Sequence, residues 1–138
     1  MIRHYHPRDL SQVVELGKRV AKRITRDDTD SEPEVLGRNL EMYSEYEDGL
    51  VLVSDVGGHI NGILVAMINT PLWNSRRIAR DLMLGAEGCG EELVASYKVW
   101  ALARGAEQVC VHCNSGSKRA EQFYDDMGAK RIGSMWEI

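Results

Sequence analysis

A glycine-rich stretch at residues 85–90, Gly-Ala-Glu-Gly-Cys-Gly, joins a predicted strand to a predicted helix. A turn of this kind presents free backbone N–H groups at the positive end of a helix, an arrangement that suits a phosphate group. Its glycines permit positive φ and let a ligand come close to the backbone. Glu87, Glu91 and Glu92 oppose an anion at the same place. The stretch therefore either binds a phosphate weakly or has no ligand and only caps a helix.

Asp81 is a carboxylate inside an aliphatic strand, Ile-Ala-Arg-Asp-Leu-Met-Leu at residues 78–84. A carboxylate in such a strand costs free energy unless it is paired. Asp81 therefore either forms an ion pair with a cross-strand Arg or Lys on an exposed sheet face, or has a functional role.

Two polar residues frame the next predicted helix. Asn114 ends a predicted strand, and Tyr124 follows ten residues later on the helix, beyond Ala120. A phenol with an ordinary pKa near ~10 can donate a proton to a thiolate. Alternatively, Tyr124 is a core aromatic whose hydroxyl reaches the surface. The amide of Asn114 can bind a ligand, cap the helix, or do both.

The residue pattern does not favour a metal site. Cys110 and Cys113 form a single C-x-x-C without a second pair, which is weak support for zinc. We expect both to be buried structural thiols, with Cys110 and His112 on one face of their strand. The acidic linker at residues 27–32 lacks the glycine and the later glutamate of a calcium loop. This linker either attracts a cationic amine or is simply solvated.

Hydrophobic periodicity and turn signals predict the elements that position these residues. We expect strands at 2–5, 50–53, 60–68, 77–84, 108–113 and 131–138, and helices at 9–24, 33–46, 91–104 and 118–127. We expect a hairpin turn at Gly57-Gly58 to join the second and third strands. We also expect Ser31 and Glu34 to form a capping box at the start of the second helix. Only the strands on either side of the 91–104 helix have the order of a parallel crossover.

Composition limits the class of protein. The chain has 138 residues, 43% of them hydrophobic and 28% charged, and a net charge of −4, which fits a single domain at 1–138. The negative charge argues against general nucleic-acid binding, and no apolar run approaches the ~20 residues that span a bilayer. Three cysteines form no disulfide framework, and the first seven residues do not resemble a signal peptide. We expect a reduced, cytoplasmic protein.

The motif around Asn114, Ala120 and Tyr124, with the element order β-α-α-β-β-β-α-β-α-β, resembles the GCN5-related N-acetyltransferase (GNAT) family. This resemblance implies an α/β (α+β) acyl-CoA N-acyltransferase fold with a mixed, mostly antiparallel sheet flanked by helices. It also implies transfer of an acetyl group from acetyl-CoA to an amine by direct attack in a ternary complex, without a metal. By the same resemblance Tyr124 is the catalytic acid and Asp81 the base acting through water. The residues that would contact acetyl-CoA are Leu82, Met83, Leu84, Glu87, Gly88, Cys89, Gly90 and Asn114.

The glycine-rich turn departs from the family pattern, which is Gln or Arg, two free positions, Gly, one free position, and Gly or Ala. Gly88 and Gly90 match this pattern, but Gly85 stands at the Gln/Arg position and Glu87 at a position that is often basic. The alternative functions are therefore a catalytically silent binding or structural protein, or a sensor of a CoA species. A loose resemblance to short phage acetyltransferase-like proteins makes a virion component one form of the silent alternative. The expected partner is a small-molecule or peptide amine, and homo-oligomer formation stays open.

Overall fold

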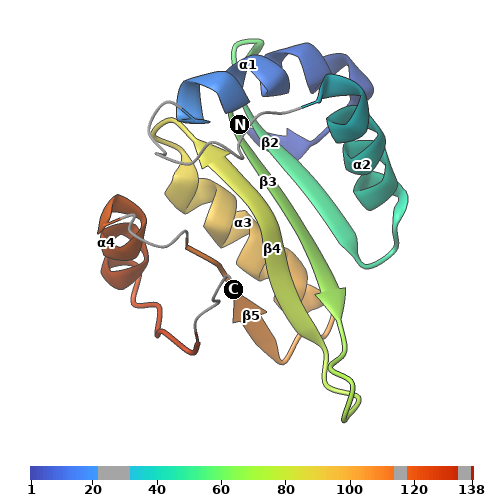
Figure 1. Ribbon diagram of the computed structural model, residues 1–138, viewed down its shortest axis with the longest axis vertical. Coiled ribbons are helices and arrows are strands. Elements are labelled where there is room, and N and C mark those ends of the chain that lie inside the picture. The colour runs from blue at the N-terminus through green and yellow to red at the C-terminus, as the bar shows by residue number, and fades with distance from the viewer. Residues whose placement is uncertain (22–31, 114–117, 134–137) are drawn as a thin grey trace.

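The computed structural model describes residues 1–21, 32–113, 118–133 and 138, and Figure 1 shows its arrangement. Among these residues no helix is both long and apolar enough to cross a lipid bilayer. In chain order the elements are β1 (Ile2–His4), a 3-10 helix (Pro7–Asp9), α1 (Leu10–Ala21), α2 (Pro33–Glu45), β2 (Gly49–Val56), β3 (His59–Asn69), β4 (Ile78–Ala86), α3 (Gly90–Ala103), β5 (Gln108–Cys110) and α4 (Lys118–Asp126).

The five strands form one sheet in the order β1-β2-β3-β4-β5. The first four are antiparallel to their neighbours, and β5 is parallel to β4 across the α3 crossover. The predicted hairpin is confirmed, because Gly57 and Gly58 join β2 to β3 with φ values of 60° and 91°. Two successive positive φ values define the tight turn that matches the twist of paired strands. The predicted mixed, mostly antiparallel sheet is therefore confirmed.

The sheet is buried on both faces, so the structure has three layers (Figure 1). Leu50 and Leu52 on β2 pack in a cluster under α3, while the alternate residues Val51 and Val53 pack in a cluster under α1 and α2. This alternation is the period of two of a β-strand. The buried residues of α3 recur at helical spacing and form its inner face, namely Leu93, Val94, Tyr97 and Ala101.

The other helices differ from prediction in detail. In α1 the buried residues are Val13, Val14 and Leu16, whereas Gly17, at helical spacing from Val13 and Val14, is exposed. Val35 at the start of α2 is also exposed. Ser31, expected to begin a capping box, lies outside the described residues. Glu32 occupies the N-cap of α2 and makes no side-chain cap hydrogen bond.

The strands beyond α3 are shorter than predicted. β5 ends at Cys110 rather than residue 113, and Arg131–Gly133 are not in a strand. The rest of the predicted final strand, at 134–137, lies outside the described residues. The predicted start of the glycine-rich turn, at Gly85, was also wrong, because Gly85 and Ala86 still belong to β4. The turn itself is confined to residues 87–89.

Candidate active site

A β-bulge in β4 determines where Asp81 lies. Adjacent residues of β3 pair with Met83 and Asp81, so Leu82 is an extra residue on β4. Ala79 and Leu84 both pack in the cluster under α3, although they are five residues apart and a regular strand would place them on opposite faces. The bulge therefore reverses the alternation of β4, as bulges near functional sites commonly do. It leaves Asp81 on the face of Ala79, which α3 covers.

Asp81 is buried and is bonded to His112, which comes just after β5. The Asp81 side chain is 2% exposed, and its Oδ1 accepts both the backbone N–H of His112 and a contact from ring Nδ1, each at 2.8 Å. Within the described part of the chain, its Oδ2 has no hydrogen-bond partner. Asp81 is therefore neither on an exposed face nor paired with a cross-strand Arg or Lys, as the first of our two interpretations required.

The contact with Asp81 fixes the protonation of the His112 ring. An ionised carboxylate only accepts hydrogen bonds, so Nδ1 must carry the proton and the neutral ring keeps its lone pair on Nε2. The hydrogen bond that the ring donates to Asp81 raises the pKa of His112, against the opposing effect of burial. The ring is 54% exposed, so solvent or another molecule can reach it.

Tyr124 lies on α4 within electrostatic reach of Asp81. Burial raises the pKa of Tyr124, and the charges of Asp81 and Cys113 raise it further. The phenol is half-buried and stays protonated throughout the neutral range. It can therefore donate a hydrogen bond or a proton near the Asp81–His112 pair.

β4 and β5 pair over only three residues. Ile78, Ala79 and Arg80 pair with residues 108–110, after which β5 ends while β4 continues to Ala86. Within the described residues, no strand pairs with the 81–86 segment on that side. Figure 1 shows β5 beside the first part of β4 only. This edge of β4 leads from Asp81 to the glycine-rich turn.

The turn at residues 87–89 is held by its neighbours. The Glu87 N–H donates to the Asn61 carbonyl on β3 at 2.9 Å, and the buried Cys89 Sγ contacts the same carbonyl at 3.4 Å. Gly88 has φ of +82°, which explains the glycine there. Cys89 is the N-cap of α3 and makes no side-chain cap hydrogen bond. The first N–H groups of α3 therefore receive no acceptor from the capping side chain.

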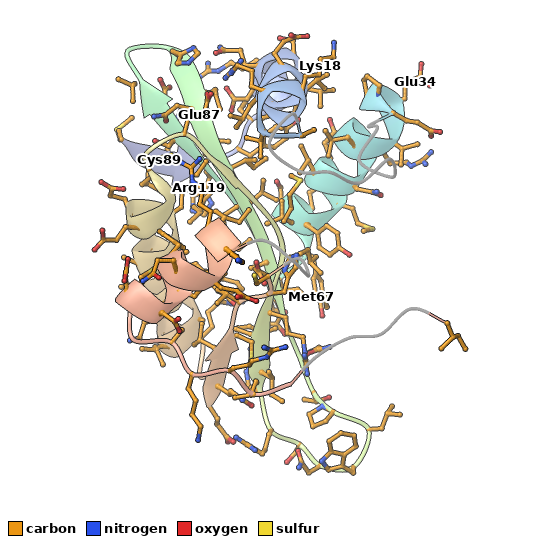
Figure 2. All side chains as sticks on the ribbon, turned by 60° about the vertical axis from the view of Figure 1, so that its left-hand side comes forward. Lys18, Glu34, Met67, Glu87, Cys89 and Arg119 are labelled. Atoms are coloured by element: carbon orange, nitrogen blue, oxygen red, sulfur yellow. The ribbon has the colours of Figure 1, made fainter. Side chains whose placement is uncertain are left out.

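Glu87, whose charge we expected to oppose a phosphate, is paired with Arg19. Arg19 on α1 donates to both Glu87 carboxylate oxygens, with the shortest distance at 2.9 Å from Nη2 to Oε1. Figure 2 shows Glu87 on the side of the turn nearer to α1, and Cys89 where α3 begins. Glu91 and Glu92 remain exposed in the first turn of α3. Of the three acidic residues that we expected to oppose a phosphate, Glu91 and Glu92 are thus exposed, and Glu87 is paired with Arg19.

The remaining candidates lie on β4 and at the start of α3. Leu82 is exposed at the bulge, and Met83 and Leu84 are half-buried. Gly90 is in contact with α4, since a Cβ there would lie 3.1 Å from Phe123 Cζ. Asn114 lies outside the described residues.

The cysteine predictions were partly wrong. Cys113 is exposed and Cys110 only half-buried, while Cys89 is the buried thiol. The described residues contain no group of three His, Cys, Asp or Glu side chains that could hold a metal ion.

Sequence reasoning missed His112 as the partner of Asp81 and Arg19 as the partner of Glu87. His112 was detectable in principle. The parallel register places Ile78 beside Gln108, and equal steps along both strands then bring Asp81 beside Val111, next to His112. No comparable signal exists for Arg19, because the contact depends on how α1 crosses the sheet.

Comparison with known proteins supports the fold but not a family assignment from sequence. No protein-family model matches the chain, and no curated protein matches it. Solved structures match along its whole length. A transcriptional regulator from Bacillus halodurans has a TM-score of 0.81 at 18% identity, covering 100% of this chain and 97% of that one. The aminoglycoside acetyltransferase meta-AAC0020, from an uncultured soil metagenomic sample, has a TM-score of 0.73 at 17% identity, with coverages of 100% and 94%.

A third similar structure is the aminoglycoside N-acetyltransferase AAC(6')-Iy in complex with CoA, with a TM-score of 0.75 at 12% identity and coverages of 100% and 97%. At these identities the likeness concerns the fold alone. The sheet order, the parallel β4–β5 pair and these matches define the chain as having the GNAT-like acyl-CoA N-acyltransferase fold.

Proposed function

We propose that the protein is an acetyl-CoA-dependent N-acetyltransferase, which transfers an acetyl group to an amine by direct attack in a ternary complex. The observation that carries this proposal is the edge of β4 at residues 81–86, with which no described strand pairs on the β5 side. This edge runs from the buried Asp81 to the start of α3, where the N-cap Cys89 makes no side-chain hydrogen bond. An extended ligand bearing amides can hydrogen-bond such an edge, and a pyrophosphate suits the N-terminus of a helix. Acetyl-CoA combines both groups in one molecule.

In this proposal residues 82–84 and the turn at Glu87–Gly90 hold acetyl-CoA, and Asn114 is a further residue that contacts it. The half-buried Tyr124 stabilises and protonates the departing thiolate, and Asp81 belongs to the base that deprotonates the amine. The acceptor is a small-molecule or peptide amine. The solved structures with this fold include aminoglycoside acetyltransferases, one of them bound to CoA and another to sisomicin, which is consistent with such an acceptor.

A second candidate is a silent or sensing member of the fold, which could be a virion component if the chain is encoded by a phage. Glu91 and Glu92 favour it, because they remain exposed at the start of α3 and would repel a pyrophosphate. Gly85 also brings no side chain to the site.

A thermal shift with acetyl-CoA tests binding. A ligand at 100 times its Kd adds about 2.7 kcal/mol. For 138 residues the entropy of unfolding is about 0.29 kcal/mol/K, so Tm rises by about 9 °C. No shift at millimolar acetyl-CoA would exclude the enzyme, and a shift without thiol release across a panel of amines would favour the sensor.

Two glycine variants separate binding from folding. Gly88→Ala and Gly58→Ala both place a Cβ at positive φ, 82° and 91°, and neither Cβ meets an atom within 4 Å. They should cost similar stability, but only Gly88→Ala should weaken acetyl-CoA binding. Tyr124→Phe should lower turnover and leave the thermal shift intact.

A further inference from the structure

The contacts between β4 and the segment after β5 identify a proton acceptor other than Asp81. We propose that His112 Nε2 takes the proton from the acceptor amine, and that Asp81 is the positioning residue that holds the His112 ring. This inference rests on the proposed function, since it concerns the base of the same reaction.

The burial of the two side chains is the first argument. Asp81 is 2% exposed and already accepts two hydrogen bonds from His112 on one oxygen, whereas the His112 ring is 54% exposed. A general base has to come within about 3 Å of the proton it removes. The exposed imidazole can come this close to the amine proton, whereas the buried carboxylate could take the proton only through an intervening water.

The tautomer is the second argument. Asp81 Oδ1 lies 2.8 Å from Nδ1, so that nitrogen carries the proton and Nε2 is the basic atom of the neutral ring. The same Oδ1 also accepts the His112 backbone N–H at 2.8 Å, which fixes the segment as well as the ring. The arrangement resembles the carboxylate–imidazole part of a hydrolase triad, where the carboxylate orients the ring and stabilises its cation.

The second oxygen of Asp81 is the third argument. Oδ2 is buried and has no partner in the described part of the chain, although a buried carboxylate oxygen normally accepts a hydrogen bond. A donor from another molecule would satisfy it. A water placed between Oδ2 and the His112 ring would supply such a donor.

The step balances without a further reactant. Nε2 takes one proton from the ammonium, and the freed lone pair forms a bond to the acetyl carbonyl carbon. The carbon–sulfur bond then breaks, the sulfur takes a proton that Tyr124 donates, and the acetylated nitrogen loses its second proton to the phenolate. The products are the amide, the CoA thiol and a protonated His112, which returns its proton to solvent.

Of the groups around Asp81 whose pKa values its charge affects, His112 is the one that titrates near neutral pH. Burial raises the pKa values of Tyr97 on α3, Cys110 on β5 and Tyr124 on α4, and the charge of Asp81 raises them further. Arg80 on β4 lowers the pKa values of Tyr97 and Cys110, and Glu121 on α4 raises that of Cys113. Because Asp81 raises the pKa of His112, the neutral base forms only above the ordinary value of ~6.5.

The test is the pH dependence of kcat/KM for acetyl transfer in the full chain. The wild-type rate should rise with pH through an inflection above ~6.5. Asp81→Asn keeps an oxygen that accepts both His112 N–H groups but removes the charge, so the inflection should move to lower pH while the rate falls. His112→Ala should abolish the inflection and lower kcat by about 10²–10⁴-fold, with partial recovery in added imidazole. His59→Gln, an exposed hairpin residue, is the matched control and should change nothing.

Two other results would contradict the assignment in distinguishable ways. Turnover in His112→Ala with an unchanged profile would overturn the role of His112 and leave the acetyltransferase proposal standing. Absence of wild-type turnover, with every amine tried, would overturn both. NMR titration of His112 supplies a readout without activity: the ring should titrate above ~6.5 with its proton on Nδ1, and Asp81→Asn should lower that pKa.

Discussion

Gly62→Ala is the sharpest test of how the sheet positions the start of α3. Gly62 lies on β3, between β2 and β4, and its φ is not positive, so alanine meets no backbone obstacle there. A Cβ would overlap Cys89 Sγ and lie 2.8 Å from Leu93 Cδ1. Both side chains are buried, at 6% and 0% exposure, so neither can turn into solvent. The methyl group can fit only if Cys89 and Leu93 repack or the first turn of α3 moves away from the sheet.

Overpacking of this kind costs about 1–3 kcal/mol. With an unfolding entropy of about 0.29 kcal/mol/K for 138 residues, Tm should fall by about 3–10 °C. Gly17→Ala is the matched control, because Gly17 is an exposed position inside α1 with no atom within 4 Å of an added Cβ. Alanine there should stabilise the helix by up to about 1 kcal/mol and raise Tm by about 2–3 °C.

Calorimetry of four proteins tests the reasoning: wild type, Gly62→Ala, Cys89→Ala and the double variant. Cys89→Ala removes the overlapping sulfur, so Gly62→Ala should cost at least about 1 kcal/mol less in that background. A Gly62→Ala protein as stable as the wild type would refute the close packing of β3 against α3. If Gly62→Ala lowers the stability equally with and without the Cys89 sulfur, overlap with that sulfur is refuted as the cause.

Two further predictions concern groups outside the proposed site. Arg3 and the His6 N–H hold the pKa of the buried Asp9 below its ordinary value, with the Arg3 contact at 2.8 Å. The stability from this pair is present above the unfolded pKa of ~3.9 and is lost as pH falls below it, so urea unfolding at pH 7 and pH 3.5 should differ less in Asp9→Asn than in the wild type. Tyr97→Phe removes the 2.9 Å hydrogen bond from the buried hydroxyl to the Cys110 carbonyl and should cost about 1–2 kcal/mol in chemical denaturation, whereas Tyr46→Phe, at an exposed residue, should cost almost nothing.

Elements with a strong local period were predictable from the sequence. In α3 the spacing of Leu93, Tyr97 and Ala101 is that of one helix face, and all three are buried. The β2–β3 hairpin followed from two adjacent glycines, which few turns other than a tight one require. In α1 the local pattern was ambiguous, since Gly17 and Leu16 lie side by side and only packing against the sheet decides that Leu16 is buried.

The site was less predictable because its geometry depends on pairing between distant strands. The bulge at Leu82 exists only relative to β3, and it determines which side of the sheet the following side chains face. The partner of Asp81 depends on the parallel register across a crossover, 31 residues along the chain. Asp81 itself was identifiable as a charge in an aliphatic strand, but its environment was not.

The free energy of Asp81 bears on whether the site is catalytic or silent. A buried carboxylate oxygen without a hydrogen-bond partner costs about 1–3 kcal/mol in lost solvation, and Asp81 Oδ2 is such an oxygen within the described residues. A site that served only to close the fold would be more stable with an apolar side chain at this position, since replacing buried ionic groups by packed apolar ones is often stabilising. A costly acid that orients an accessible base beside a protonated phenol is the arrangement that proton transfer requires. The paired Glu87 points the same way, because Arg19 partly offsets the charge of that carboxylate in the turn proposed to bind a pyrophosphate. These two features together favour the enzyme over the silent alternative.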